Sequence, residues 1–362
     1  MLQRALASQL GSLLAEVQWA RHSRAGATPD ADILIELTGS RGRRMCLLVH
    51  VKPDMRPSMF AAWSKSTPGP NQTSVPVLAM PSVSPRLAEL CRREGWSWLD
   101  LAGNCRLDVP GLLHIERSGR SPVRRQPRRG SNLGTAAAAR VIRVLLSTAH
   151  AGRTWTQRSL QAHTCWHLPD QKPVSLGLVN KVVQHLRDEG FIDPEASGIR
   201  VKDPMGLLTA WREAYRFADH QRLQYFTLLK PEQLGKSLDH LRREAGGLCL
   251  YAAFSAAERQ APQVRQPRTW VYVSADHLDE LVQRTEARPV DSGENLVVLV
   301  PNDPGVFLSF EPPGRSVGKG LGCTDPVQTY VDLFKLDGRG QEAAQAILEQ
   351  RLMKAWQAAG LE

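Results

Sequence analysis

The first part of the chain holds charged side chains at the spacing of a metal-dependent phosphodiesterase site. Asp32 enters the strand-like run 32–37, and Lys52 ends the next such run, 45–52. In sites of this kind two acids on neighbouring strands hold Mg²⁺, and a lysine steadies the attacking water or the charged phosphate. Glu16, on a predicted leading helix, is a further position at which such a site carries an acid. The pattern predicts cleavage of nucleic acid if the second of these protein strands, 45–52, also supplies an acidic residue.

That second acid is missing. The order and spacing are those of PD-(D/E)xK nucleases, which need an acid two residues before the lysine, and the residue there is His50. A neutral imidazole is a poor ligand for the hard Mg²⁺ ion, and it removes one negative charge from the site. We therefore expect a restriction-endonuclease-like α/β scaffold without catalysis. Its degenerate positions are Glu16, Asp32, His50 and Lys52.

A second set of residues suits the reading of duplex DNA. The run from Ser175 to Glu189 predicts a helix with Ser175 as N-cap and an apolar inward stripe. Asn180 and Gln184 on its outer face are expected to read bases, because their amides can form paired hydrogen bonds with adenine. The other side chains expected at the DNA are Ser175, Lys181, Arg187, Arg153, Thr156, Arg200 and Lys202. A helix of this kind also serves as a protein-docking module in other folds, which is the alternative for this face.

Positive charge is concentrated around this helix. The whole chain has 46 Lys and Arg against 36 Asp and Glu, a net charge of +10. Between Arg117 and Arg187 there are 13 basic residues and a single acid, Asp170, so this segment alone carries +12. It begins with a Pro-, Gly- and Arg-rich linker over 117–133, which can follow a phosphate backbone. The linker arginines expected to contact DNA are Arg124, Arg125, Arg128 and Arg129.

Other motifs are incomplete. Gly246-Gly247 before an apolar run is typical of nucleotidyltransferases, but the run at 268–274 lacks their Asp-x-Asp pair. Segment 314–322 is rich in Gly and Lys but does not match a P-loop. The HxCxH run at 163–167 has no fourth ligand nearby, and the six cysteines form no CxxC pair. We expect no metal and no cofactor, and the isolated thiols favour a reducing cytoplasm.

Hydrophobic periodicity divides the chain into three folded parts and so predicts an α/β multi-domain protein. Residues 1–116 form the nuclease-like part, and residues 117–133 the basic linker. The strands expected in the first part are 32–37, 45–52, 75–80, 97–103 and 105–116. Helices are expected near its start, at 56–65, and at 84–93 with Ser84 as N-cap.

Residues 134–204 predict a central winged helix-turn-helix. Its helices are expected at 135–150, from 157 with Thr156 as N-cap, and over 175–189, followed by a two-stranded wing at 191–204 that turns between Pro194 and Gly198. Residues 205–362 predict a mixed α/β part, with a nucleotidyltransferase-like fold as one alternative. Its expected helices are 205–221, 275–286, 324–334 and 340–357, and its strand-like runs are 246–258, 268–274, 294–301 and 305–310. No apolar stretch is long enough to predict a membrane span.

Several of these stretches resemble the bacterial AbiEi-type antitoxin and transcriptional-regulator family. They are SWLDLAGNCRL, RTWTQRSL, VSLGLVNKVVQHLRDEGFI, GENLVVLVPNDPGVF and DPVQTYVDLFKLDGRGQEAAQAIL. The resemblance implies a winged-helix antitoxin of a type IV toxin–antitoxin or phage-defence operon, which represses its own promoter. It also implies neutralisation of a nucleotidyltransferase-like toxin encoded nearby, without a stable complex. In this sequence the DNA-reading role would fall on Ser175 to Glu189, and the nuclease-like front part is additional to the family's short members.

The sequence thus predicts a cytoplasmic bacterial regulator that binds double-stranded DNA sequence-specifically and performs no catalysis. A homodimer is expected, because operator sites are often palindromic. Two alternatives remain at this stage. One is a Mg²⁺-dependent PD-(D/E)xK endonuclease acting through Asp32 and Lys52, and the other is a nucleotidyltransferase-like enzyme acting through residues 246–322.

Overall fold

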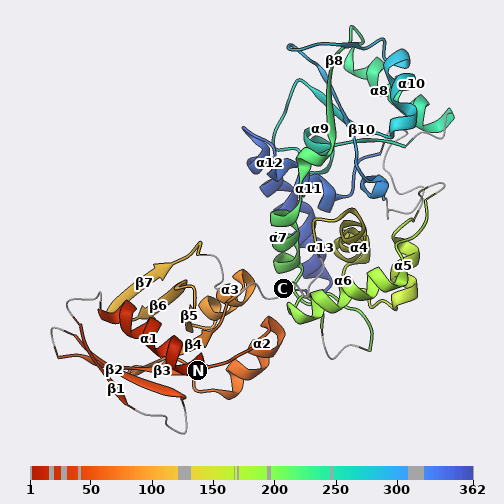
Figure 1. The fold of residues 1–362 in the computed structure, drawn as a ribbon. Helices are drawn as coiled ribbons and strands as arrows, with labels where there is room; N and C mark the ends of the chain where they lie inside the picture. The colour runs from red at the N-terminus through yellow and green to blue at the C-terminus, as the bar shows by residue number, and fades with distance from the viewer. Residues whose placement is uncertain are drawn as a thin grey trace. The chain divides into compact units, whose positions relative to one another are not determined.

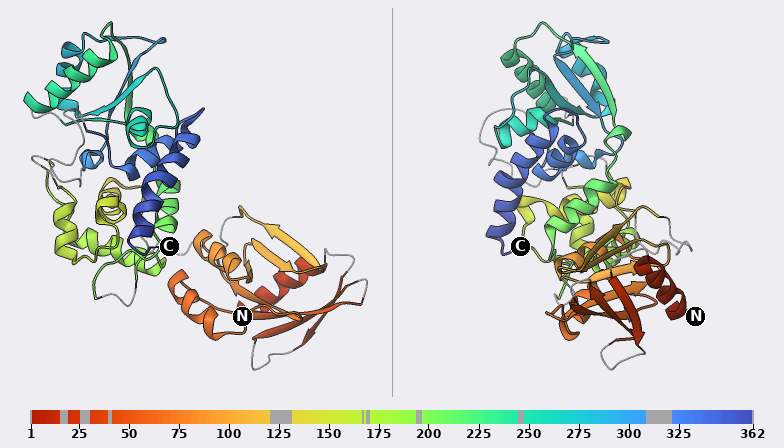
Figure 2. Two further views of the ribbon diagram at one scale, coloured as in Figure 1. Left: turned by 180° about the vertical axis from the view of Figure 1, so that it is seen from behind. Right: turned by 90° about the vertical axis from the view of Figure 1, so that its left-hand side faces the viewer.

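The computed structural model describes residues 2–15, 20–25, 31–39, 42–120, 132–166, 168, 171–193, 197–244, 248–308 and 322–361. The chain forms two compact units. The first comprises Met1–Arg128 together with Asp188–Gly190, and the second comprises Arg129–Arg187 and Phe191–Glu362. Each unit contains one mixed sheet flanked by helices (Figures 1 and 2), so the predicted α/β class is confirmed. Among the described helices, none is both long and apolar enough to cross a bilayer.

The first unit is built on a seven-stranded sheet whose strands lie in chain order, β1 to β7. The pairs β3–β4 and β4–β5 are parallel, and the other neighbours are antiparallel. The strands are β1 (Ala20–Ala25), β2 (Ile33–Gly39), β3 (Arg44–Val51), β4 (Ser74–Met80), β5 (Ser97–Asp100), β6 (Cys105–Val109) and β7 (Leu113–Arg117). The helices are α1 (Leu2–Ala15), α2 (Pro57–Ser66) and α3 (Pro85–Arg93).

Helices cover both faces of this sheet. Alternating apolar residues of β2 and β3 pack with Leu6, Leu10 and Leu14 of α1 in one core. Phe60 of α2 and Leu87 of α3 pack in a second core on the opposite face. The strand β4 is buried along its whole length, because its odd-numbered residues lie in the first core and Leu78 and Met80 lie in the second. This explains why residues 75–80 form a continuous apolar run rather than an alternating one.

Most elements predicted for this unit are present, with two differences. Ser84 caps α3 as expected, since its hydroxyl accepts a hydrogen bond from Leu87 N at 3.2 Å. The run 105–116 is not one strand but two, β6 and β7, which turn at Gly111, where φ is +70°. The strand β1 was not predicted, because it lies in a segment that we assigned to the continuation of the leading helix or left without structure.

The second unit begins with a group of helices. These are α4 (Ala136–Leu146), the short 3₁₀ turn η1 (Thr148–His150), α5 (Gln157–His163), α6 (Leu176–Asp188) and α7 (Pro204–Ala214), followed by η2 (Phe217–Asp219). Thr135 caps α4 and Thr156 caps α5, as the sequence predicted for the latter. After α6, two antiparallel bridges join Ile192 to Val201 and Trp155 to Ile199. Residues 194–196 of the predicted wing turn lie outside the described residues.

The rest of this unit surrounds a five-stranded sheet with the order β11-β8-β12-β10-β9. The pair β12–β10 is parallel, and the others are antiparallel. The strands are β8 (Gln221–Phe226), β9 (Cys249–Tyr251), β10 (Thr269–Val273), β11 (Arg288–Pro289) and β12 (Leu296–Val300). The helical elements are α8 (Pro231–Glu244), α9 (Ala253–Gln260), η3 (Ala275–His277), α10 (Leu278–Arg284), η4 (Pro304–Phe307), α11 (Pro326–Phe334), α12 (Gly340–Ile347), a π-helical turn η5 (Leu348–Leu352) and α13 (Met353–Ala358).

One continuous core runs from α4, α5 and α6 into this sheet. Side chains of α8 and α10 pack on one face of the sheet. Those of α9, α11 and α12 pack on the other face, in the same hydrophobic cluster as α4, α6 and α7. Figure 1 shows α4, α7, α11 and α13 side by side, and the rear view in Figure 2 agrees. As a result α4 is buried nearly all round, including Arg143 at 3% exposure, and not only on the apolar face that the sequence predicted.

Three predictions for this unit were wrong in detail, and three elements were not predicted. The helix expected at 205–221 ends at Ala214, and β8 begins at Gln221. The strand-like run 246–258 contains the predicted strand only as β9, and from Ala253 on it is the helix α9, whose alanines favour helix and pack into the cores on both of its sides. The run 305–310 begins as the 3₁₀ turn η4, capped by Asp303, and not as a strand. The elements β8, α8 and β11 were not predicted.

Candidate nucleic-acid interface

The helix α6 has one buried face and one exposed polar face. Its buried residues are Val179, Val182, Val183 and Leu186, and the exposed ones predicted to meet DNA are Ser175, Asn180, Lys181 and Gln184. Arg187, near the end of the helix, is half-buried. Ser175 caps the helix as expected, because its hydroxyl accepts a hydrogen bond from Leu178 N at 3.4 Å. A polar helix face carrying an amide pair and a lysine can donate to base edges and to phosphates.

The side chain of Asn180 is held by the preceding helix. Gln157, the first residue of α5, donates a hydrogen bond from Nε2 to Asn180 Oδ1 at 2.9 Å. This leaves the amide NH₂ of Asn180 and the second lone pair of its oxygen for another partner. A restrained amide suits paired recognition of a base, which requires its donor and acceptor to lie in one plane. Gln157 was not predicted, because a contact across 23 positions leaves no local pattern in the sequence.

Thr156 serves the fold of this region. Its hydroxyl accepts a hydrogen bond from Ser159 N at 3.1 Å, and Ser159 Oγ accepts one from Thr156 N at 3.0 Å. This reciprocal pair is a capping box, which satisfies two backbone donors at the start of α5. Thr156 is exposed, but its hydroxyl oxygen already accepts the hydrogen bond that caps α5.

Arg153 lies on a cluster of rings beneath α5. Its guanidinium carbon is 3.9 Å from the ring centre of Trp155, which is 2% exposed. The rings of His150 and His163 meet the Trp155 ring edge to face at 4.9 and 4.7 Å. Burial lowers the pKa of His150 to about 4 and also lowers the pKa of His163, so both rings are neutral near pH 7. The cluster thus holds one permanent cation, Arg153, against a group of uncharged aromatic rings.

The segment that follows α6 carries the last two predicted contacts. Trp155 and Ile199 exchange two backbone hydrogen bonds of 2.8 Å, and Lys202 N donates to Phe191 O at 2.8 Å. These bonds tie the segment to the start of α5 and to the end of α6. Lys202 is exposed and Arg200 is half-buried. The arginines predicted in the linker, Arg124, Arg125, Arg128 and Arg129, lie outside the described residues.

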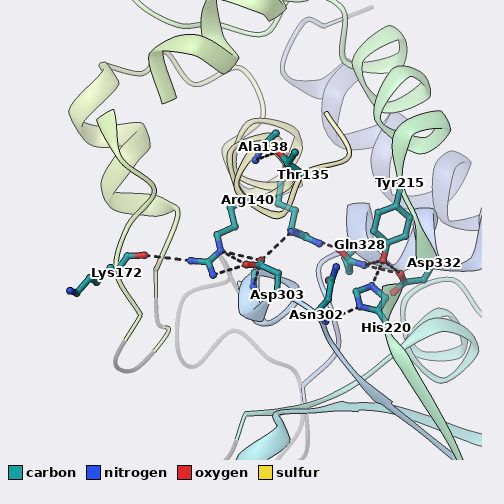
Figure 3. A network of polar contacts seen from close by, with 12 residues as sticks. Thr135, Ala138, Arg140, Lys172, Tyr215, His220, Asn302, Asp303, Gln328 and Asp332 are labelled. Atoms are coloured by element: carbon teal, nitrogen blue, oxygen red, sulfur yellow. Dashed lines mark hydrogen bonds and ion pairs between the residues drawn. The ribbon is translucent and has the colours of Figure 1, made fainter. Parts of the chain in front are cut away.

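Two arginines of the basic segment are not available to a phosphate. Arg140 of α4 donates through Nε and Nη2 to Asp303, with a shortest N···O distance of 2.6 Å. Arg143 donates through Nε to Gln328 Oε1 at 2.7 Å and lies over the ring of Trp211. Figure 3 shows the Arg140–Asp303 pair between α4 and η4. The charge of +12 therefore overstates the cationic surface, because these two arginines join α4 to the C-terminal elements.

A buried polar network continues from Arg143. Asp332 of α11, which is 0% exposed, accepts hydrogen bonds from Tyr215 Oη at 2.6 Å, Gln328 Nε2 at 2.7 Å and Tyr272 Oη at 3.1 Å. His220 lies 2.7 Å from Tyr215 Oη through Nε2 and accepts from Asn302 N through Nδ1 (Figure 3). Burial raises the pKa of Asp332 to about 7 and lowers that of His220 to about 4. This network was not predicted, although Gln328 and Asp332 are polar residues four positions apart on a largely apolar helix.

In the first unit, three of the four nuclease-like positions, Asp32, His50 and Lys52, make contacts with neighbouring residues of the fold. The carboxylate of Asp32 accepts a hydrogen bond from Val51 N at 2.7 Å. Lys52 extends over the ring of Trp63, 5.0 Å from its centre, and His50 is buried between the rings of Trp63 and Trp96. Glu16 lies outside the described residues.

The remaining motifs form no metal site in the part of the chain that is described. Within those residues, no group of three His, Cys, Asp or Glu side chains can hold a metal ion. In the HxCxH run, His163 Nδ1 lies 2.8 Å from Ser159 O and its ring stacks on Trp166 at 4.6 Å, while His167 lies outside the described residues. Gly246, Gly247 and residues 314–321 of the Gly- and Lys-rich segment also lie outside them.

Comparison with known proteins identifies one family. Residues 200–353 match the family model described as "Transcriptional regulator, AbiEi antitoxin, Type IV TA system". This stretch contains α7, the five-stranded sheet and the Tyr215–His220–Asp332 network, and it ends after α12 and η5. No curated protein and no solved structure matches the chain. The resemblance seen in the sequence is thereby confirmed for the C-terminal part of the chain.

Proposed function

We propose that this chain, whose residues 200–353 are of the AbiEi type, is a transcriptional regulator that binds double-stranded DNA through α6. In this proposal residues 134–204 are a winged helix-turn-helix, with α5 as the supporting helix and α6 as the helix that enters the major groove. The observation that carries the proposal is the two-sided character of α6. Its apolar side is buried, while Asn180, Lys181 and Gln184 line the exposed side.

Each predicted contact then has a role that follows from its chemistry. Asn180 and Gln184 read base edges, since amides can both donate and accept. Lys181, Arg187, Arg153 and Lys202 neutralise phosphates, together with Arg200 and the linker arginines Arg124, Arg125, Arg128 and Arg129. Ser175 and Thr156 contribute chiefly as caps that set where α6 and α5 begin.

The proposed biological setting is a bacterial type IV toxin–antitoxin or phage-defence operon. The chain would repress the operon's promoter and counter a nucleotidyltransferase-like toxin encoded nearby, without forming a stable complex with it. A homodimer binding a palindromic operator is the assembly that we propose, because two-fold symmetric sites require two reading helices. The chain would act through binding and not through catalysis.

The test is DNA binding by the full chain, measured by fluorescence anisotropy at fixed salt. One duplex carries the sequence upstream of the chain's own coding region, and a second has the same composition in scrambled order. We expect the upstream duplex to bind about a thousandfold more tightly, the lower end of the range for specific sites. Equal affinity for both duplexes would contradict a sequence-specific regulator, and no affinity for either would contradict DNA binding altogether.

A further inference from the structure

A cavity of about 500 Å³ opens beside His220, within the C-terminal elements of the second unit. Its walls come from η2, β8, α9, β10 and the residues that follow α11. The volume is in the range of small-molecule sites. None of the residues proposed to contact DNA lines it. The cavity is therefore a separate feature that the proposed function does not use.

Three aromatic side chains form part of the lining. These are Phe217, Phe254 and Trp270. Trp270 is 2% exposed and Phe254 is 4% exposed, and their ring centres lie 5.9 Å apart. Both rings are packed into the core and expose almost none of their surface, so they form a rigid floor of the cavity, and the half-buried Phe217 offers the apolar surface against which a flat ring can pack.

The polar part of the lining is mainly cationic. Arg222, Arg268 and Lys335 face one acid among the lining residues, Asp337. The guanidinium of Arg222 lies over the Trp270 ring, 5.0 Å from its centre, and Arg268 is held by Glu294 at 2.9 Å. Positive charge next to a fixed aromatic wall is complementary to a planar ring that carries an anionic group.

We propose that this cavity binds a small aromatic anion, either a nucleoside monophosphate or an aromatic carboxylate. The two share the chemistry that the lining recognises, a flat ring for Phe217 and a negative charge for Arg222 and Lys335. They differ in the anionic group, which an experiment can separate.

The cavity wall is connected to α4 by hydrogen bonds. His220 lines the cavity and contacts Tyr215 Oη, which accepts from Gln328, and Gln328 in turn accepts from Arg143 of α4. All four side chains are buried. Both ring nitrogens of His220 already form hydrogen bonds. A ligand that moves the His220 ring therefore has to disturb this chain of contacts. This step rests on the proposed function: occupancy of the cavity changes the affinity of the chain for DNA.

The site is tested by calorimetric titration of the full chain with AMP, GMP and salicylate, and with inorganic phosphate for comparison. We expect AMP or GMP, or else salicylate, to bind with a Kd of about 1 mM or tighter, and phosphate alone to bind more weakly. The double variant Arg222→Glu/Lys335→Glu should lose about tenfold or more in affinity. Both residues are exposed, so the fold should persist, which the urea midpoint checks.

The matched control is Lys236→Glu, which changes an exposed lysine of a different hollow, on α8. It should leave the titration unchanged. Binding of none of the three aromatic probes would overturn the site, and so would binding that survives the double charge reversal in a folded variant. Preference for AMP or GMP over salicylate would identify the phosphate-bearing class, and the reverse preference the carboxylate class; either result supports the site.

The link to α4 is tested separately by DNA affinity with and without the probe that binds. We expect a change of about fivefold or more, the lower end of measured couplings between sites. Tyr215→Phe, which removes only the hydroxyl, should reduce that change while the probe still binds. An unchanged DNA affinity at saturating probe would overturn the link but not the site. A chain that binds no DNA would instead overturn the proposed function, while the titration would still decide on the cavity.

Discussion

The carboxylate of Asp303 accepts hydrogen bonds from two guanidinium nitrogens of Arg140, Nε and Nη2. The shortest of these contacts, from Nη2 to Oδ2, is 2.6 Å. The side chains of Arg140 and Asp303 are only 12% and 9% exposed. Asp303 also accepts a hydrogen bond from Gly305 N at 2.8 Å, so the pair joins the turn before η4 to α4. The first helix of the proposed DNA-binding region is thus fixed to the part of the same unit that matches the AbiEi family model.

Removal of Arg140 should therefore destabilise the second unit strongly. Arg140→Ala leaves the buried Asp303 with only Gly305 N and the more distant Arg143 Nη1, 4.0 Å away, as partners, and we expect a loss of about 3 kcal/mol in the free energy of unfolding. Urea denaturation monitored by tryptophan fluorescence measures this loss. Arg158→Ala removes an exposed arginine of the neighbouring α5 and should cost less than about 0.5 kcal/mol. Similar losses in the two variants would show that the pair does not bind the elements together.

The buried His150 predicts a dependence of stability on pH. Its pKa is about 4 in the folded chain against 6.5 in the unfolded one, because burial disfavours the imidazolium. Between these values the unfolded chain binds more protons, so stability present above pH 6.5 is lost as the pH falls toward 4. We expect His150→Gln to flatten this part of the curve of urea midpoint against pH. The exposed His240→Gln is the control, and an unchanged slope in the His150 variant would be the contrary result.

Lys181 should act on DNA without regard to sequence. It lies on the exposed face of α6, and a phosphate contact releases counterions whatever the bases are. Lys181→Ala should weaken binding to cognate and scrambled duplexes alike and reduce the slope of log K against log[salt] by about one unit. Anisotropy titrations over a series of salt concentrations measure the slope. The exposed Lys236→Ala on α8 should leave it unchanged. A loss confined to one sequence would contradict the phosphate role.

Local patterns in the sequence predicted the caps and faces of the elements that carry the candidate site. Ser175, Thr156 and Ser84 were expected as caps and are caps, because capping depends on residues within a few positions of one another. The apolar stripe of α6 was also visible in the spacing of its valines and leucines. These features depend on a single helix and its immediate neighbours along the chain.

Contacts between distant segments were not predictable in this way. The arginines of α4 looked like part of a cationic surface, and only packing against η4 and α11 shows that Arg140 and Arg143 are held by Asp303 and Gln328. Residues 253–258, in α9, looked like a continuation of the strand before them because a helix that is buried on both sides loses its amphipathic period. The contact between Gln157 and Asn180 was missed for the same reason, since it joins two helices.

That contact supports a prediction about base reading. Gln157→Ala removes the donor that restrains Asn180, and we expect about 1 kcal/mol less binding to the cognate duplex with little change on the scrambled one. In a double-mutant cycle with Asn180→Ala the two effects should not add, because both act on the same base contact. Full additivity would mean that Gln157 does not act through Asn180. The cycle is measured by anisotropy at one salt concentration.

The central claim, that α6 reads sequence, is tested most directly by the affinity of Asn180→Ala for cognate and scrambled duplexes. The variant should lose about 1–3 kcal/mol on the cognate duplex alone, since a base contact contributes only where its base is present. Gln345→Ala, an exposed amide on α12, should behave like the unaltered chain. If Asn180→Ala weakens both duplexes equally, or neither, the exposed face of α6 does not read bases.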